Sequence, residues 1–95
     1  MTGIAGRDYA TKILGSKVKI KIILALMRLG EANISRIVKE TSSHYYTVEK
    51  HLRELEELGI VDERRLGRVR VFSLNYENPR VPVILELIKS LNSGD

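Results

Sequence analysis

Apolar residues recur at helical spacing most clearly along residues 42–59. Four of them share one face of the predicted helix: Val48, Leu52, Leu55 and Leu58. Their steps of four, three and three residues match the helical period. At roughly 100° per residue, Tyr46, Lys50 and Arg53 fall on the opposite face. We therefore expect a helix with a buried leucine stripe and an aromatic, cationic outer face.

The ends of this helix are marked by small residues. Ser42 or Ser43 is expected to cap its N-terminus, because a serine oxygen can accept a hydrogen bond from the free amides of the first turn. Gly59 is expected to end it, because helices commonly end at a residue in the left-handed conformation.

Two shorter helices are predicted upstream. The first runs over residues 17–29 between a Ser16 cap and Gly30, and it is apolar on almost all sides. It is either the central buried helix of the domain or a helix whose extra apolar face meets a second subunit. Lysines crowd its N-terminus, where the helix dipole disfavours cations unless phosphates lie near: Lys17, Lys19 and Lys21.

The second helix is predicted over residues 34–40, after an Asn33 cap and a short connection that can form a β-bridge. A tight polar turn, residues 41–43, joins it to the helix described first. Two helices joined in this way form a helix-turn-helix pattern.

The hydrophobic period then changes from helical to alternating. Residues 60–64 and 69–74 are predicted strands, joined by a hairpin turn in which Gly67 can take a positive φ. Four arginines gather near the hairpin tip: Arg64, Arg65, Arg68 and Arg70. Like charges on paired strands repel, so we interpret the tip as a contact for a phosphate backbone rather than a solvated basic end.

A last helix is predicted over residues 79–92, beginning between Pro79 and Val83. Its apolar seam consists of Val81, Ile84, Leu85, Ile88 and Leu91. The band is wider than one neighbouring element usually covers, which favours a dimer interface over packing wholly within the chain.

Composition narrows the class of protein. The 95 residues form one domain, of which residues 1–8 are expected to be flexible. No cysteine is present, so disulfides and thiolate metal sites are excluded. The net charge of +4 favours a polyanionic partner. Without an apolar run of membrane-spanning length or a signal peptide, we expect a cytoplasmic protein with no membrane partner.

Several stretches together resemble the winged helix-turn-helix transcription regulators of the ArsR/MarR kind, most closely their small archaeal members. The matching stretches are residues 14–26, 33–37, 47–61 and 64–74, which cover roughly residues 14–75. The resemblance implies an α+β, mostly α fold with a three-helix core, a two-stranded wing hairpin and an extra C-terminal helix for dimerisation. It also implies a homodimer that binds double-stranded DNA in a sequence-specific way.

In such a protein the helix at about residues 43–58 enters the major groove, and the wing at about residues 60–74 touches the backbone or the minor groove. The positions that would face DNA carry Ser43, His44, Tyr45, Tyr46, Thr47, Lys50 and, a turn further on, Arg53. Those on the wing carry Arg65, Arg68 and Arg70. The absence of cysteine departs from the metal-sensing branch of the family, so thiolate metal sensing is not expected.

Alternatives remain open at this point. Lys50 and Arg53 can contact phosphate or guanine, or they can form surface pairs with Glu54 and Glu57. An architectural, nonspecific DNA-binding protein or a winged-helix protein-interaction module would use the same fold. We expect no cofactor, no metal and no enzymatic activity, because no catalytic motif is present. The sequence identifies no small-molecule effector, no operator and no sign of regulation.

Overall fold

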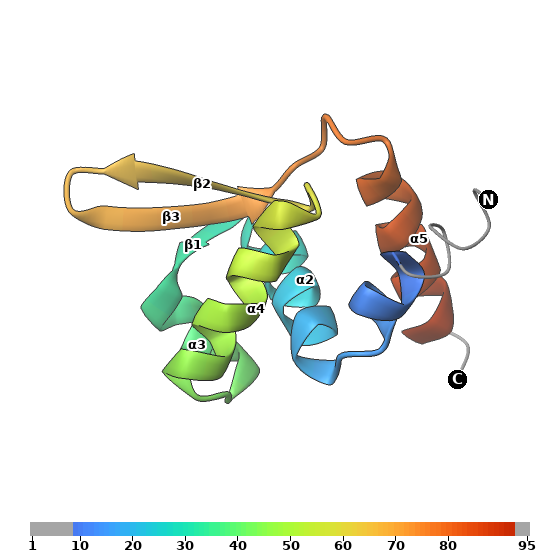
Figure 1. Ribbon diagram of the computed structural model, residues 1–95, viewed down its shortest axis with the longest axis horizontal. Helices are drawn as coiled ribbons and strands as arrows, with labels where there is room; N and C mark the ends of the chain where they lie inside the picture. Colours follow the sequence, from blue (N-terminus) through green and yellow to red (C-terminus); the bar gives the residue numbers. More distant parts are fainter. Residues whose placement is uncertain (1–8, 93–95) are drawn as a thin grey trace.

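The computed structural model describes residues 9–92, so the flexibility expected for residues 1–8 lies outside the described residues. Residues 9–14 are helical and are followed by α2 (Lys17–Leu29), β1 (Glu31–Asn33), α3 (Ile34–Thr41) and α4 (Tyr45–Glu57). Then come β2 (Val61–Leu66), β3 (Val69–Leu74) and α5 (Arg80–Asn92). Helices α2, α3 and α4 form the body from which the β2–β3 hairpin extends, while α5 lies at the far end from the hairpin tip (Figure 1). This arrangement is the expected α+β, mostly α fold.

The sheet has three antiparallel strands in the order β1-β3-β2. The predicted bridge at residues 31–33 is therefore a short strand, with Ala32 opposite Phe72. In the hairpin Leu66 pairs with Val69, and Gly67 has a φ of 64°, as the predicted turn requires. Strand alternation places Phe72 and Leu74 in the core, as predicted.

The core forms where the apolar stripes of the helices meet the sheet. Ile22, Ile37, Leu52 and Phe72 are completely buried in a single cluster. Burying one such side chain stabilises the fold by about 1.5–3 kcal/mol. The predicted leucine stripe of α4 is therefore the surface that fixes this helix to the body.

Most of the predicted helix boundaries are confirmed. The side chains of Ser16 and Asn33 accept hydrogen bonds from the backbone amides of Lys19 and Arg36, at 3.2 and 2.9 Å. Gly59 has a φ of 78° just after α4, and the following amide donates back to the Leu55 carbonyl at 2.9 Å. These local signals were sufficient because each cap satisfies backbone groups that the helix leaves unpaired.

The predicted serine cap of α4 is wrong. Ser42 closes α3 in the left-handed conformation, with φ 52° and ψ 37°. The hydroxyl of Ser43 donates to the Thr41 carbonyl oxygen instead of receiving an amide of α4. The residue at the N-cap is His44, whose side chain makes no capping hydrogen bond. The connection between the two helices thus uses both serines to end α3.

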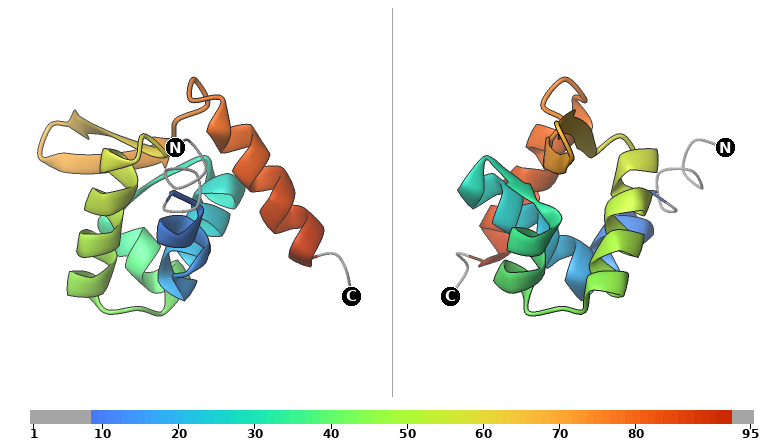
Figure 2. Two further views of the ribbon diagram at one scale, coloured as in Figure 1. Left: turned by 45° about the vertical axis from the view of Figure 1, so that its right-hand side comes forward. Right: turned by 90° about the vertical axis from the view of Figure 1, so that its left-hand side faces the viewer.

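The predicted seam of α5 divides into two faces. Val81, Leu85 and Ile88 are buried in the core of the single chain, and the assignment of the seam to a dimer interface stays a prediction. Val83, Leu87 and Leu91 are exposed, and Ile84 is half-buried. Residues 9–14 and α5 lie next to each other, away from the wing (Figure 2). None of the helices in residues 9–92 has the length and apolar character needed to cross a bilayer.

Candidate nucleic-acid interface

The outer face of α4 carries the side chains that the sequence placed there. Tyr46 is 79% exposed, and Lys50 and Arg53 are exposed on the same side of the helix. Inward-facing Val48, Leu52 and Leu55 hold this face in place. Tyr45 is also exposed. The face therefore presents hydrogen-bonding and cationic groups without any large rearrangement.

The N-terminal end of α4 lies beside this face. His44 is exposed, and Ser43 and Thr47 are half-buried. No acidic side chain stands in the first turn, and no side chain caps it. The first amides and the helix dipole therefore favour an anion at this end.

Within residues 9–92 the structure does not contain the surface ion pairs of Lys50 and Arg53 that the sequence suggested as an alternative to DNA contacts. Arg53 Nη2 donates to Glu49 Oε2 at 3.5 Å, rather than to Glu57. Glu54 does not pair with Lys50, because its Oε1 lies 2.9 Å from Lys19 Nζ and 3.1 Å from His51 Nδ1. The hydrogen bond from Lys19 is the main reason why the pKa of Glu54 is lowered. Lys50 has no such partner among the described residues.

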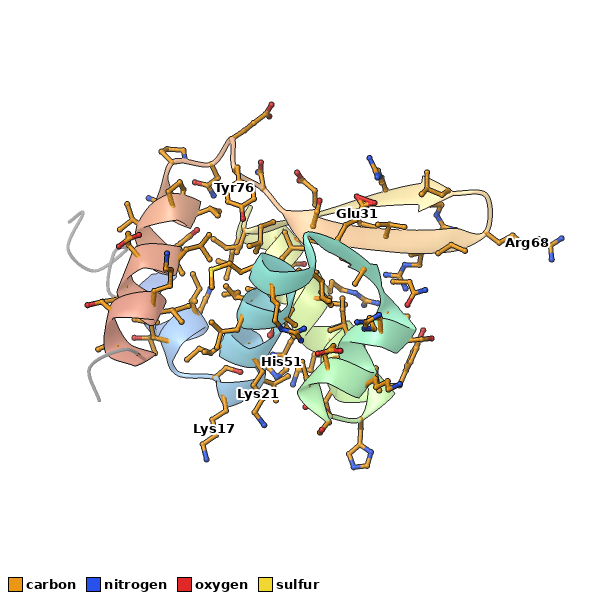
Figure 3. The ribbon with its side chains drawn as sticks, turned by 180° about the vertical axis from the view of Figure 1, so that it is seen from behind. Lys17, Lys21, Glu31, His51, Arg68 and Tyr76 are labelled. Carbon is orange, nitrogen blue, oxygen red and sulfur yellow. The ribbon has the colours of Figure 1, made fainter. Side chains whose placement is uncertain are left out.

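Lys19 is buried, which corrects part of the prediction for the start of α2. Only 8% of its side chain is exposed, and its ammonium group is held by Glu54 of α4. It therefore links two helices of the body and is inaccessible to a phosphate. Lys17 and Lys21 are exposed and project from α2 into solvent (Figure 3).

The four wing arginines fall into two classes. Arg64 makes two hydrogen bonds to the Glu31 carboxylate, at 2.8 and 2.9 Å. Arg70 is held by Glu49 and Glu63. Arg65 and Arg68 form no ion pair within residues 9–92 and are exposed. Figure 3 shows Arg68 projecting beyond the end of the hairpin.

The strand register explains this division. Side chains alternate between the two sheet faces, and Arg65 lies directly opposite Arg70. Arg65 is therefore on the α4 side of the hairpin, together with Arg70 and Phe72. Arg64 points to the other side, where Glu31 of β1 meets it. The unpaired charge of the wing is thus concentrated on the side facing α4 and at the tip.

Around Arg70 the ionisable groups influence one another. Its hydrogen bonds with Glu63, and then with Glu49, raise the pKa of the guanidinium. The same bond lowers the pKa of Glu63. Burial raises the pKa of Glu56, and the neighbouring Glu63 carboxylate adds to that effect. The expectation that Arg70 contacts phosphate must therefore compete with two acids that already occupy its guanidinium.

Sequence reasoning missed the acidic partners of these arginines. A two-residue turn after Leu66 fixes the register, and that register sets Glu63 diagonally across from Arg70. This signal could have identified Glu63. Glu49 and Glu31 come from other elements, so no local pattern reveals them.

A comparison with protein-family models matches residues 16–63, half of the chain, to the arsR family of bacterial regulatory proteins. The chain belongs to the arsR family. It is accordingly a sequence-specific DNA-binding transcription regulator and not an enzyme. The matched residues run from the cap of α2 into β2, so they contain the helix-turn-helix and the start of the wing.

Solved structures share the fold at low sequence identity. Reduced HlyU from Vibrio cholerae N16961 has a TM-score of 0.79 and 18% identity, over 97% of this chain and 94% of that chain. The transcriptional repressor PagR of Bacillus anthracis has a TM-score of 0.73 and 22% identity, over 92% and 97%.

The homodimeric winged helix-turn-helix domain of Mb0332 from Mycobacterium bovis has a TM-score of 0.73 and 20% identity, over 95% of this chain and 83% of that chain. A comparison with curated protein sequences finds no match. The likeness to archaeal members stays a prediction.

Proposed function

We propose that this regulator binds its operator as a homodimer, with α4 in the major groove and the β2–β3 wing against the adjacent backbone or minor groove. The observation that carries this proposal is the common orientation of two cationic surfaces. Lys50 and Arg53 project from α4, and Arg65 lies on the hairpin face that looks toward the same helix. A duplex placed against α4 would meet both.

The residues in this proposal have different roles. Arg53 and Lys50 contact guanine edges or phosphates, because arginine can donate two parallel hydrogen bonds to guanine. Tyr45, Tyr46, His44 and Ser43 contact the backbone around the start of α4. Arg65 and Arg68 contact phosphates from the wing.

The dimer interface in this proposal is an apolar groove of about 350 Å³ between residues 9–14 and α5. Leu14, Val83 and Leu87 line it and are exposed in the single chain. A second copy covering this groove would remove those side chains from water. The homodimeric state stated for Mb0332 supports this arrangement. We also propose a cytoplasmic location, where a DNA-binding regulator has access to the genome.

The test is a selection of operators from random duplexes, followed by binding measurements with Lys50→Ala plus Arg53→Ala. We expect the wild-type protein to prefer its selected site by at least about 10³-fold over random DNA. The double variant should lose that preference while remaining folded, because both side chains are exposed. Lys89→Ala, an exposed cation on α5, is the control and should bind normally. Unchanged specificity in the double variant would remove α4 from the groove.

A further inference from the structure

One arginine held by two acids joins the wing to α4. Arg70 Nε and Nη2 donate to the two oxygens of Glu63, at 2.8 and 3.2 Å. Arg70 Nη1 donates to Glu49 Oε1 at 2.9 Å. The three side chains are only 20–27% exposed, and the guanidinium lies 5.2 Å from the Phe72 ring centre. Bidentate, charge-assisted bonds of this kind fix orientation as well as distance.

The two acids hold Arg70 in different ways. Glu63 belongs to β2 and Arg70 to β3, so their bond lies within the hairpin. Glu49 belongs to α4, so its bond with Arg70 joins the hairpin to the helix that faces DNA. Glu49 also accepts the weaker bond from Arg53, at 3.5 Å. A continuous series of contacts therefore runs from the wing through Glu49 to a side chain of the DNA-facing surface.

The outer hairpin buries little apolar surface. Beyond Arg70 toward the tip, Leu66 and Val69 are 54% and 46% exposed. An isolated two-stranded hairpin is only marginally stable in water. The ion pair between Arg70 and Glu49 joins the hairpin to α4 at the point where the hairpin leaves the core, so it restrains the outer hairpin relative to α4.

We propose that Arg70 and Glu49 are positioning residues, which set the angle of the wing to α4 and orient Arg53 before DNA binds. Arg70 itself makes no contact with phosphate. This inference rests on the proposed function, because both residues would act on the way in which α4 and the wing contact the same duplex. It also gives Glu49 a role other than reading a base, since both of its oxygens are already engaged.

The first measurement is made on the free protein. The sequence contains no cysteine, so cysteines at Glu57 and Val69 can carry spin labels on α4 and the wing without other changes. Because the proposed protein is a homodimer, labelled protein is mixed with an excess of unlabelled protein, so that distances are measured within one protomer. The otherwise wild-type protein should then give one narrow distance distribution between the labels. Glu49→Gln and Arg70→Met should broaden it, whereas Arg70→Lys should restore part of the narrow component. Glu31→Gln breaks the Arg64 pair without touching α4, so it is the matched control and should leave the distribution narrow.

The second measurement is binding to the selected operator as a function of salt. Either variant should weaken binding roughly tenfold, the cost of ordering a long side chain at each half-site. The dependence on salt should stay at the wild-type slope, because no phosphate contact is lost. The double variant Glu49→Gln, Arg70→Met should bind as tightly as whichever single variant binds less tightly. Both substitutions break the same bond between Arg70 and Glu49, so their effects should not add.

Two results would overturn the inference. One is a narrow distance distribution in both variants, which would show that other contacts hold the wing. The other is a salt slope that falls by about 0.9 for each Arg70 removed, which would identify a direct phosphate contact. A wild-type protein that binds no duplex would instead refute the proposed function. The distance measurement, made without DNA, would still decide whether Arg70 and Glu49 set the wing angle.

Discussion

Replacing Arg65 and Arg68 with glutamine should make DNA binding much less sensitive to salt. Both side chains are exposed and without an ion pair in the described part of the chain, so they are free to meet phosphates. Glutamine keeps a polar, though shorter, side chain and removes the charge. The matched control is Arg28→Gln plus Arg64→Gln, which removes the same net charge from arginines already bound to Glu40 and Glu31.

The magnitude follows from the number of contacts. Two unpaired arginines in each protomer give four phosphate contacts in a dimer, and each contributes about 0.9 to the slope of log affinity against log salt. The variant should therefore have a slope lower by about 3.6. Over a rise from about 50 to about 200 mM salt, the wild-type protein should lose about 150-fold more affinity than the variant. The preference for the operator over random DNA should change little, because phosphate contacts carry no sequence information.

Fluorescence anisotropy with a labelled operator, at several salt concentrations, measures this slope directly. An unchanged slope in the Arg65, Arg68 variant would refute the assignment of these residues to phosphates. An equal fall in the control would show that net charge matters and pairing does not. Nonspecific DNA measured in parallel should give the same difference in slope between variant and wild type.

Three further predictions concern the dimer, the body and pH. Val83→Glu with Leu87→Glu should give a monomer with weak DNA binding by analytical ultracentrifugation, whereas Glu86→Lys on the polar side of α5 should remain a dimer; a dimer that survives both glutamates would move the interface elsewhere. Lys19→Met should lower the free energy of unfolding by about 1–3 kcal/mol, between the values for exposed and buried pairs, and an unchanged urea midpoint would contradict it. Burial raises the pKa of Glu56 in the folded state, so the folded protein holds this proton more tightly than the unfolded chain does. The free energy of unfolding of the wild-type protein therefore falls as pH rises from the ordinary pKa through the raised one. Glu56→Gln should therefore be more stable than wild type near neutral pH and no more stable below the ordinary value of 4.5, and an equal gain at both pH values would disprove this origin.

The helices and the hairpin could be predicted because their signals are local. Ser16 and Asn33 satisfy amides only a few residues away, and Gly67 permits a turn that any two neighbouring strands can use. The prediction of the α4 cap was wrong because Ser42 and Ser43 lie between two helices and could end the first or cap the second. Ending α3 and starting α4 compete for the same short connection, and propensity alone does not decide between them.

The apolar band of α5 shows a different limit. Its spacing predicts a wide apolar band, but the helical period cannot say which part of the band packs on the body. Val81 and Leu85 turn toward the body, and Val83 and Leu87 turn away from it. The division depends on how residues 9–14 and α5 pack, which is tertiary information. The sequence therefore predicted the apolar band, of which Leu91 is exposed and Ile84 half-buried, but not how the band divides between the body and the outer face.

The charges near the wing show why a site is harder to predict than a fold. Sequence proximity suggested that Arg64, Arg65, Arg68 and Arg70 act as one basic cluster. The sheet separates them, because Arg64 meets Glu31 and Arg70 meets Glu49 and Glu63. A paired arginine must break its bonds before it can gain a phosphate, whereas an unpaired one gives up only hydration. We therefore expect paired Arg70 to fix the position of the wing, and unpaired Arg65 and Arg68 to add affinity for DNA. Substitutions of Arg70 should change the wing geometry, whereas substitutions of Arg65 and Arg68 should change the salt dependence of binding.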